Sequence, residues 1–398
     1  MTEATLFRLV ADLVEAAITA SRRSSNFLPR ALWTPATTIR DGQSATPDGS
    51  LGADSLELLE IGAAVNHFFH LYEWGTEDNL LRRRDLGWWA EVVSATIEDQ
   101  WQRLTFHTSG STGEPKAIVQ PRARLEQEAA YWAGLFPGSH RLISLVPAHH
   151  LYGFLWTVLL PERAGWPVVD ARSWSPARLL HELRPGDIVV GFPFRWELIA
   201  RAGGRFPEEV TLISSAGALA SATWPQLTAA GAAQVLEVYG STETGAVAWK
   251  DSYARPYRLL PYWTHNLSTG QLSREGAEEP DLPMDHLHWS SPDEFTIAGR
   301  KDQAVKVGGA LVHLPLVEAA IREYPGVSAC AVRPGDEDQA RLKAFVVWQE
   351  GSTASDLTEL SRWLGTRLPA GAVPRHYCVG EHLPMDGNGK VLNWKTQQ

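Results

Sequence analysis

The chain has 398 residues, of which 44% are apolar and 21% charged, and this balance excludes disordered, collagen-like and membrane-spanning classes. Its 36 basic and 46 acidic residues give a net charge of −10, which argues against nucleic acid as a partner, because nothing would offset repulsion by phosphates. Cys330 and Cys378 are too few for a disulfide framework or a cysteine metal cluster. We therefore expect a cytoplasmic protein without a leader segment or a membrane span.

The first hundred residues predict an all-helical segment. Apolar residues recur at three- and four-residue steps over 5–23, as in an amphipathic helix, whereas residues 24–53 are rich in proline and glycine and predict a loop. A second helix is expected from Asp54, whose side chain can cap it, and a third over 85–97. This segment has 8 arginines, no lysine and 15 acidic residues, so it holds −7 of the net charge.

From about residue 102 the pattern changes to alternating strands and helices, which is typical of a largely parallel, covered sheet. The expected strands lie at 142–146, 188–190, 210–214 and 235–238, and the expected helices at 122–135 and 175–183. Beyond residue 300 the chain predicts a small α+β domain, with helices at 316–323 and 354–368 and strands at 327–332 and 344–348. The predicted domains are 1–100, 101–301 and 302–398.

The strongest chemical signal is the string HTSGSTGEPK, from His107 to Lys116. Its glycines allow close approach of the backbone to a ligand, its hydroxyls can donate hydrogen bonds, and its lysine adds positive charge, which together suit a polyphosphate. These residues are Thr108, Ser109, Gly110, Ser111, Thr112, Gly113 and Lys116. The glycine-to-lysine spacing differs from a Walker A loop, and a polar hairpin turn is the alternative interpretation.

A second string, VYGSTET over 238–244, follows a predicted strand. Its aromatic ring can stack on a nucleobase, its hydroxyls can bind phosphate and its carboxylate can ligate Mg²⁺. The residues concerned are Tyr239, Gly240, Ser241, Thr242 and Glu243. Two later strings place lysines near glycines, at 298–309 (AGRKDQAVKVGG) and at 386–390 (DGNGK).

In this order, the four strings resemble the adenylate-forming superfamily of acyl-CoA synthetases, peptide-synthetase adenylation domains and luciferases, over residues 102–395. The resemblance implies an α/β adenylate-forming fold with a small α+β C-terminal domain. It also implies an acid–thiol ligase that uses ATP and Mg²⁺ to convert a carboxylic acid into acyl-AMP. The acyl group would then pass to a phosphopantetheine thiol, on an acyl carrier protein or in CoA.

The resemblance implies roles for matching positions. The loop up to Lys116 would hold the ATP β- and γ-phosphates, Tyr239 would lie against adenine, Thr242 would contact the α-phosphate and Glu243 would ligate Mg²⁺. Lys390 would stabilise the charge that develops during adenylation. The arginine that the family places after this lysine is absent here.

Three further assignments follow from the same resemblance. The small-residue turn Ala216, Gly217 and Ala218 would line adenine and the acyl pocket. Asp285 precedes Arg300 by fifteen residues, as the ribose-binding aspartate does, although the usual Thr-Gly-Asp is Pro-Met-Asp here. Asp302 would be the hinge between the large and small domains.

The string VPAHHLYGF over 146–154 resembles the segment in which the family places a histidine or aromatic gate beside the acyl pocket. Alignment on its proline favours His150 as the gate, and a core or surface histidine is the alternative. The same run resembles the short aryl-polyene and xanthomonadin-type synthetases, so an aryl acid is the favoured substrate.

Only about 105 residues precede the phosphate loop, so the family's usual N-terminal subdomain is expected to be absent. In its place, LGADSLELLE over 51–60 resembles the acyl carrier protein motif, in which Ser55 would accept phosphopantetheine. A plain helix cap at Asp54 and Ser55 is one alternative, and a degenerate carrier that replaces the subdomain is another. We therefore favour loading of a carrier protein, in cis or in trans, over two alternatives: a CoA ligase and a degenerate, partner-binding scaffold.

Overall fold

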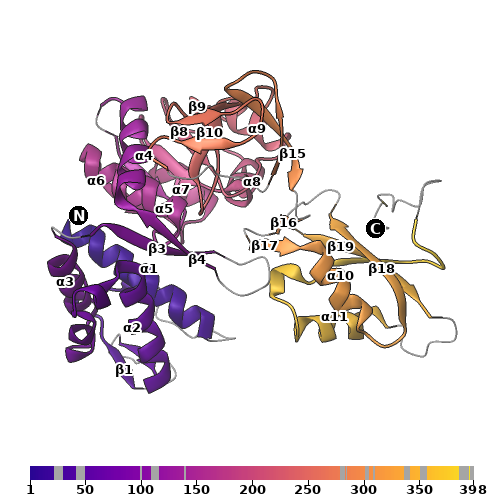
Figure 1. The fold of residues 1–398 in the computed structure, drawn as a ribbon, viewed down its shortest axis with the longest axis horizontal. Helices are drawn as coiled ribbons and strands as arrows, with labels where there is room; N and C mark the ends of the chain where they lie inside the picture. Colours follow the sequence, from indigo (N-terminus) through magenta and orange to yellow (C-terminus); the bar gives the residue numbers. More distant parts are fainter. Residues whose placement is uncertain are drawn as a thin grey trace. The chain divides into compact units, whose positions relative to one another are not determined.

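A computed structural model describes residues 1–21, 30–41, 50–98, 101–108, 116–138, 140–277, 283, 285–300, 304–307, 310–335, 341–349, 356–384 and 394 (Figure 1). The chain forms two compact units. The first contains residues 1–108 and 116–255, and the second contains the described residues from 256 onward. The predicted domain boundary at residue 100 does not coincide with this division, because the N-terminal helices cluster with the β/α body.

Three helices begin the first unit, as the apolar periodicity predicts: α1 (Glu3–Ser21), α2 (Ser55–Phe69) and α3 (Leu86–Ile97). The Asp54 carboxylate caps α2 by accepting the N–H groups of Leu56 and Glu57, both at 2.9 Å. The Asp85 carboxylate caps α3 in the same way. The cap at Asp54 was predicted, since a side chain that reaches its own helix depends only on local sequence.

The prediction of an all-helical start is wrong. Two short parallel strands, β1 (Ile39–Asp41) and β2 (Leu51–Ala53), pair Ile39 with Leu51 inside the region predicted as a loop. Both of these apolar side chains are buried. Strands of three residues are too short to show a period, so only the pairing itself reveals them. The 3₁₀ turns Arg30–Leu32, Leu71–Glu73 and Glu77–Arg82 complete the segment.

The β/α body confirms the predicted strand and helix order. Its strands are β5 (Leu142–Ser144), β6 (Val168–Asp170), β7 (Ile188–Gly191), β8 (Thr211–Ser214), β9 (Gln234–Ser241) and β10 (Gly245–Lys250). They lie in the order β10-β9-β8-β7-β5-β6, in which β9 to β6 are parallel and β10 is antiparallel to β9. Neighbouring parallel strands therefore end at the same edge of the sheet.

The helices of the body are α4 (Arg122–Leu135), α5 (Leu151–Phe154), α6 (Leu160–Ala164), α7 (Pro176–Glu182), α8 (Pro193–Ala202) and α9 (Thr223–Ala229), with a π-helical turn at Leu155–Leu159. Leu179, Trp196 and Leu227 of α7, α8 and α9 share one apolar core with strand residues such as Val189. Burial of such side chains contributes about 1.5–3 kcal/mol each.

A separate antiparallel hairpin joins β3 (Arg103–Thr108) to β4 (Lys116–Pro121). Its register pairs Thr108 with Lys116 and Arg103 with Pro121. The two ends of the predicted phosphate loop are therefore neighbours across a ladder, as the apolar residues on both sides of the string predict.

The second unit begins with β11 (Tyr257–Leu259), β12 (Trp263–His265), β13 (Leu272–Arg274), β14 (Asp285–Trp289) and β15 (Glu294–Arg300). A hairpin of β16 (Ala304–Val307) and β17 (Ala310–His313) follows. The α+β part then contains α10 (Leu314–Arg322), β18 (Val327–Pro334), β19 (Leu342–Trp348), α11 (Leu357–Gly365), a 3₁₀ turn (Ala370–Ala372) and β20 (His376–Val379). Its helices and strands share an apolar core, as predicted for this small domain.

Within the parts of the chain that the structure describes, no helix has both the length and the apolar character needed to cross a bilayer.

Candidate active site

The end of β9 and the start of β10 place the second predicted string on a tight turn. The Ser241 N–H donates to the Thr244 hydroxyl at 3.0 Å, and that hydroxyl lies 2.8 Å from the Gly245 carbonyl oxygen, to which it donates. A Cβ on Gly240 would lie only 2.1 Å from the same carbonyl oxygen, so this position requires glycine. Because the backbone is fixed on both sides, the exposed Glu243 carboxylate projects from a rigid support.

The hairpin that carries Lys116 contacts this turn directly. Gln120, in β4, is 2% exposed, and its Nε2 donates to the carbonyl oxygens of Thr242 at 2.6 Å and Glu243 at 2.9 Å. The structure therefore brings together two strings that the sequence separates by more than a hundred residues. Sequence reasoning missed Gln120, although a lone amide in an otherwise apolar strand was a usable signal.

The Lys116 side chain is exposed at the start of β4. Thr108 lies opposite it in the ladder. The other loop residues, Ser109, Gly110, Ser111, Thr112 and Gly113, lie outside the described residues, so their predicted contacts with ATP phosphates stay a prediction.

The small-residue turn follows β8 and lies beside the end of β9. Ser215 donates through its hydroxyl to the Val238 carbonyl at 2.9 Å, which connects this turn to the residue before Tyr239. Ala216 adopts a left-handed conformation with φ of 67°, which costs a residue with a Cβ about 1–3 kcal/mol. Gly217 and Ala218 follow it. The predicted adenine residues thus share one edge of the sheet.

The predicted gate histidine, His150, precedes α5 and packs against His149, with ring centroids 4.2 Å apart. Burial, aided by the neighbouring His150, lowers the pKa of His149 to about 3. Burial also lowers the pKa of His150, against an opposing effect of Asp12, although part of its ring reaches solvent. Both rings are therefore neutral at pH 7 and can offer hydrogen bonds rather than positive charge.

The N-terminal helix α1 holds the loop that carries these histidines. The buried Asp12 carboxylate accepts the Ala148 N–H at 2.7 Å and bonds the Arg172 guanidinium at 2.7 Å. On the same helix, Arg8 donates to Thr157 in the π-helical turn. The N-terminal segment is thus part of the structural support of the predicted acyl pocket.

A further pair of histidines lies next to the phosphate loop. The ring of His67, from α2, lies 5.1 Å from the ring of His107, and both side chains are exposed. Although the side chain is exposed, partial desolvation of its ring, with the nearby His67, lowers the pKa of His107. No pattern in the sequence predicted the approach of His67, because forty residues separate the two rings.

Ser55 is the exposed first residue of α2. The capping carboxylate belongs to Asp54, and the Glu57 side chain accepts the Asp54 N–H at 2.9 Å. A helix cap, one of the predicted alternatives, is therefore present at this string, while attachment of phosphopantetheine to Ser55 stays a prediction.

In the second unit, antiparallel pairing of β14 with β15 places Asp285 opposite Arg300 in register. The fifteen-residue spacing thus has a structural basis, since a hairpin of that length returns the chain to its starting point. The predicted hinge Asp302 and the predicted adenylation residue Lys390 lie outside the described residues.

No metal cluster competes with these assignments: among the described residues, no group of three His, Cys, Asp or Glu side chains could hold a metal ion. The donor set around Glu243, a carboxylate with a neighbouring hydroxyl on Thr242, nevertheless fits Mg²⁺, which prefers oxygen ligands and takes several of them from water and phosphate.

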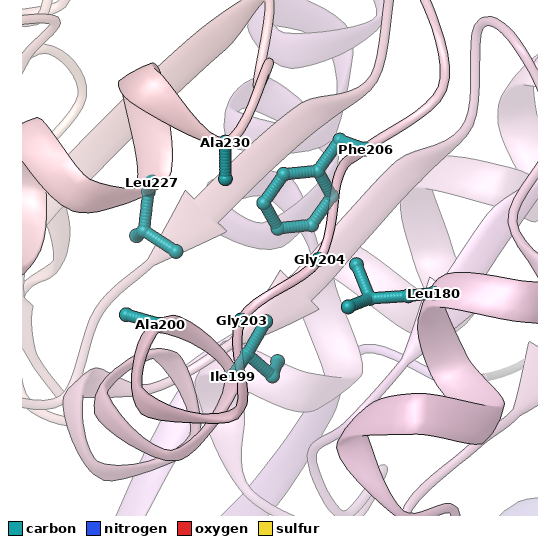
Figure 2. A pocket seen from close by; sticks show the side chains of 8 residues that line it. All are labelled: Leu180, Ile199, Ala200, Gly203, Gly204, Phe206, Leu227 and Ala230. Atoms are coloured by element: carbon teal, nitrogen blue, oxygen red, sulfur yellow. The ribbon is translucent and has the colours of Figure 1, made fainter.

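A small cavity between α7, α8 and α9 lies away from these residues (Figure 2). Its volume of about 10 Å³ is comparable to the space of one water molecule, and Leu180, Ile199, Phe206 and Leu227 are among its apolar walls. It is too small for a nucleotide or an aryl acid, so we regard it as a packing gap.

Known proteins resemble this chain over most of its length. The AMP-binding enzyme family matches residues 83–273, and the AMP-binding enzyme C-terminal domain matches residues 316–390. A 4-coumarate–CoA ligase from Rhodobacter capsulatus is 36% identical over 97% of this chain and 99% of its own length. Another from Cereibacter sphaeroides is 37% identical over 87% of this chain and 84% of its own length.

Among solved structures, o-succinylbenzoate CoA synthetase from Bacillus subtilis, bound with a product analogue, superposes with a TM-score of 0.62 at 15% identity. The match covers 98% of this chain and 92% of that one. At this identity the likeness shows the fold alone, and it confirms the predicted α/β fold with a small C-terminal domain.

Proposed function

Because the chain belongs to the AMP-binding enzyme family, we propose that it activates an aryl carboxylic acid with ATP and transfers the acyl group to CoA. The predicted class of enzyme, an acyl-AMP-forming ligase, is confirmed by this membership. The observation that carries the proposal is the 36% identity to a 4-coumarate–CoA ligase across 99% of that relative's length.

CoA is the proposed acceptor, in place of the carrier protein that we favoured from the sequence. The alignment with the Rhodobacter capsulatus relative takes in 97% of this chain and therefore includes most of residues 1–100. A protein named as a CoA ligase thus shares the short start that suggested a carrier. Carrier loading, in cis or in trans, is the second candidate, since Ser55 is exposed.

An aryl acid is the proposed substrate, because 4-coumarate is an aryl acid and two curated relatives are named for it. The neutral rings of His149 and His150 suit the polar edge of such a substrate, since neutral imidazoles can donate and accept hydrogen bonds. The names of these relatives support an aryl acid but not the finer assignment to aryl-polyene synthetases.

The first step joins the two substrates. A carboxylate oxygen attacks the α-phosphorus of ATP, a new C–O–P linkage forms, and pyrophosphate leaves with the electron pair of the broken P–O bond. Lys116 and Lys390 would offset the negative charge that gathers in this transition state. Bound Mg²⁺ would neutralise phosphate charge in the same step, with Glu243 as its protein ligand.

The second step needs no strong side-chain base. The CoA thiolate attacks the acyl carbonyl, a C–S bond forms, and AMP leaves with the electrons of the C–O bond. A cysteine nucleophile is not required. Burial raises the pKa of the Cys330 thiol to about 11, which keeps that side chain protonated.

The test is pyrophosphate exchange with a panel of aryl, short-chain and long-chain acids. We expect exchange to be strongest with hydroxylated aryl acids. Preformed acyl-AMP is then offered CoA or a holo-carrier protein, and CoA should consume it faster. Exchange with no acid in the panel would refute the proposal and favour the scaffold alternative.

The carrier alternative has its own test. The intact mass of the chain is measured after co-expression with a phosphopantetheinyl transferase, with Ser55→Ala as the matched variant. A phosphopantetheine arm on the wild type that disappears in the variant would establish the carrier alternative. An unmodified wild type would exclude loading in cis.

A further inference from the structure

We propose that Gln120 is a positioning residue for adenylation, because its side-chain amide orients the backbone of Thr242 and Glu243. This inference rests on the proposed function, in which Thr242 contacts the α-phosphate and Glu243 ligates Mg²⁺. Gln120 lies outside the strings that carry the family resemblance. It is four residues beyond Lys116, on the strand that leads away from the phosphate loop.

The chemistry of the contact fixes which way the amide points. Both partners of Gln120 are backbone carbonyl oxygens, which only accept hydrogen bonds. The NH₂ group must therefore face them, and each of its two hydrogens has its own acceptor. With 2% of Gln120 exposed, water cannot readily replace the amide. Removal of the donor would leave two carbonyl groups without this partner in a part-buried setting.

The contact acts where orientation matters most. Fixing the carbonyls of Thr242 and Glu243 fixes the two peptide planes that meet at the Glu243 Cα, and with them the direction of the Glu243 Cα–Cβ bond. The flanks of the turn have other supports: the pair Ser241 and Thr244, and the Glu128 carboxylate, which accepts the Ala246 N–H at 2.9 Å. Gln120 extends this support to the two residues that would meet phosphate and metal.

The same contact connects both ends of the triphosphate site. Lys116 begins β4, Gln120 lies on the same strand, and Glu243 lies on the turn that Gln120 holds. A shift of the hairpin would therefore move the turn with it. Residues that orient a metal ligand typically change metal affinity or activity by about 10- to 100-fold when they are lost.

Two substitutions separate hydrogen-bond donation from shape. Gln120→Met keeps the length of the side chain without a donor, whereas Gln120→Glu keeps the shape but presents oxygen to two carbonyl oxygens. Val119→Met is the matched control, because Val119 is the neighbouring residue of β4 and is 50% exposed. Unfolding midpoints of all three variants report whether the fold is retained.

The first readout is the split between the two half-reactions. For Gln120→Met we expect the Mg²⁺ concentration that gives half-maximal pyrophosphate exchange to rise about tenfold or more. The rate at which preformed acyl-AMP and CoA form the thioester should change by less than about threefold, because no triphosphate takes part in this half-reaction. Gln120→Glu should be impaired more than Gln120→Met. Equal loss of both half-reactions, or a Glu variant close to wild type, would overturn the proposal.

The second readout needs no catalysis. Amide hydrogen exchange of the ligand-free protein should be faster over residues 241–246 in Gln120→Met than in wild type or Val119→Met. Unchanged exchange in this turn would overturn the proposal even if the enzyme were active. If the wild type shows no pyrophosphate exchange with any acid, the proposed function fails. Amide hydrogen exchange would still decide whether Gln120 holds the turn.

Discussion

Asp12 is the residue through which the N-terminal helix should stabilise the predicted acyl pocket. Its carboxylate is 1% exposed and bonds the Ala148 N–H and the Arg172 guanidinium, each at 2.7 Å, and the Arg30 guanidinium lies 3.5 Å away. Asp12→Ala would leave a buried N–H without its acceptor, at a cost of about 1–3 kcal/mol, and would remove a charge-assisted bond worth about 1.5–3 kcal/mol. Arg172 still has the Asp170 carboxylate as an ion-pair partner, at 2.8 Å, in the variant. We therefore expect a loss of stability in the lower part of the combined range, about 3 kcal/mol.

Glu15→Ala is the matched control. Glu15 lies on the same helix and approaches the same guanidinium at 3.4 Å, but its side chain is 35% exposed. A pair that water can reach contributes less than about 1 kcal/mol. The two variants therefore remove one carboxylate each from Arg172, but only Asp12→Ala removes a buried carboxylate, together with the acceptor of the Ala148 N–H.

Urea unfolding followed by tryptophan fluorescence measures both losses, as the shift of the midpoint multiplied by the slope of the transition. The KM for the acid should also rise in Asp12→Ala, because Ala148 directly precedes the two pocket histidines, while the KM for ATP should change little. If Asp12→Ala costs no more stability than Glu15→Ala, the reasoning from burial is wrong.

Three further predictions address the pocket, the turn and the small domain. The pKa of His149 is about 3 in the folded state, against 6.5 for an ordinary histidine. Between pH 6.5 and 3 the unfolded chain therefore binds a proton at His149 that the folded chain does not bind. The free energy of unfolding should accordingly fall as the pH falls through this window. His149→Gln should lessen this acid sensitivity in urea titrations, whereas the exposed His181→Gln should not. Gly240→Ala should abolish pyrophosphate exchange, since its Cβ would overlap a carbonyl oxygen, whereas Gly134→Ala, with open space around it in α4, should leave exchange unchanged. Trp394→Ala should destabilise the second unit by about 3–5 kcal/mol, measured by thermal unfolding, because this buried indole packs on the small domain.

Each of these has a result that contradicts it. An acid transition unaltered by His149→Gln would show that another group governs it. Normal exchange in Gly240→Ala would mean that the turn tolerates a shift of its backbone. A Trp394→Ala variant that unfolds like wild type would show that the indole contacts contribute little: the contact with Phe345, at 5.5 Å between ring centroids, and the contact with the buried Lys343, whose Nζ lies 5.3 Å from the indole centroid.

Features that depend on near neighbours in the chain were predicted well. Asp54 caps the helix that starts beside it, the apolar period located α1, and short apolar runs located the strands of the body. The residue types of the phosphate string and of the turn at Glu243 predict phosphate and Mg²⁺ binding, and these roles stay predictions. The family then followed from the order of the strings.

Features that depend on contacts between residues far apart in the chain were not predicted. The three-residue strands β1 and β2 have no periodicity of their own and exist through their pairing. The string around Ser55 resembles a carrier motif in sequence. In the structure its aspartate, Asp54, caps a helix, and the segment packs on the β/α body. The string by itself cannot distinguish a carrier motif from a helix cap.

The sequence alone thus indicated the class of enzyme, through the family resemblance of four short strings, and it predicts the types of residue that would meet ATP. Only the tertiary structure decided which side chains hold those residues in place. Gln120 reaches Thr242 and Glu243 across more than 120 positions of chain, and Asp12 reaches Ala148 across 136. Such contacts form because folding brings separate strands and helices together, and no local pattern in the chain specifies the partner.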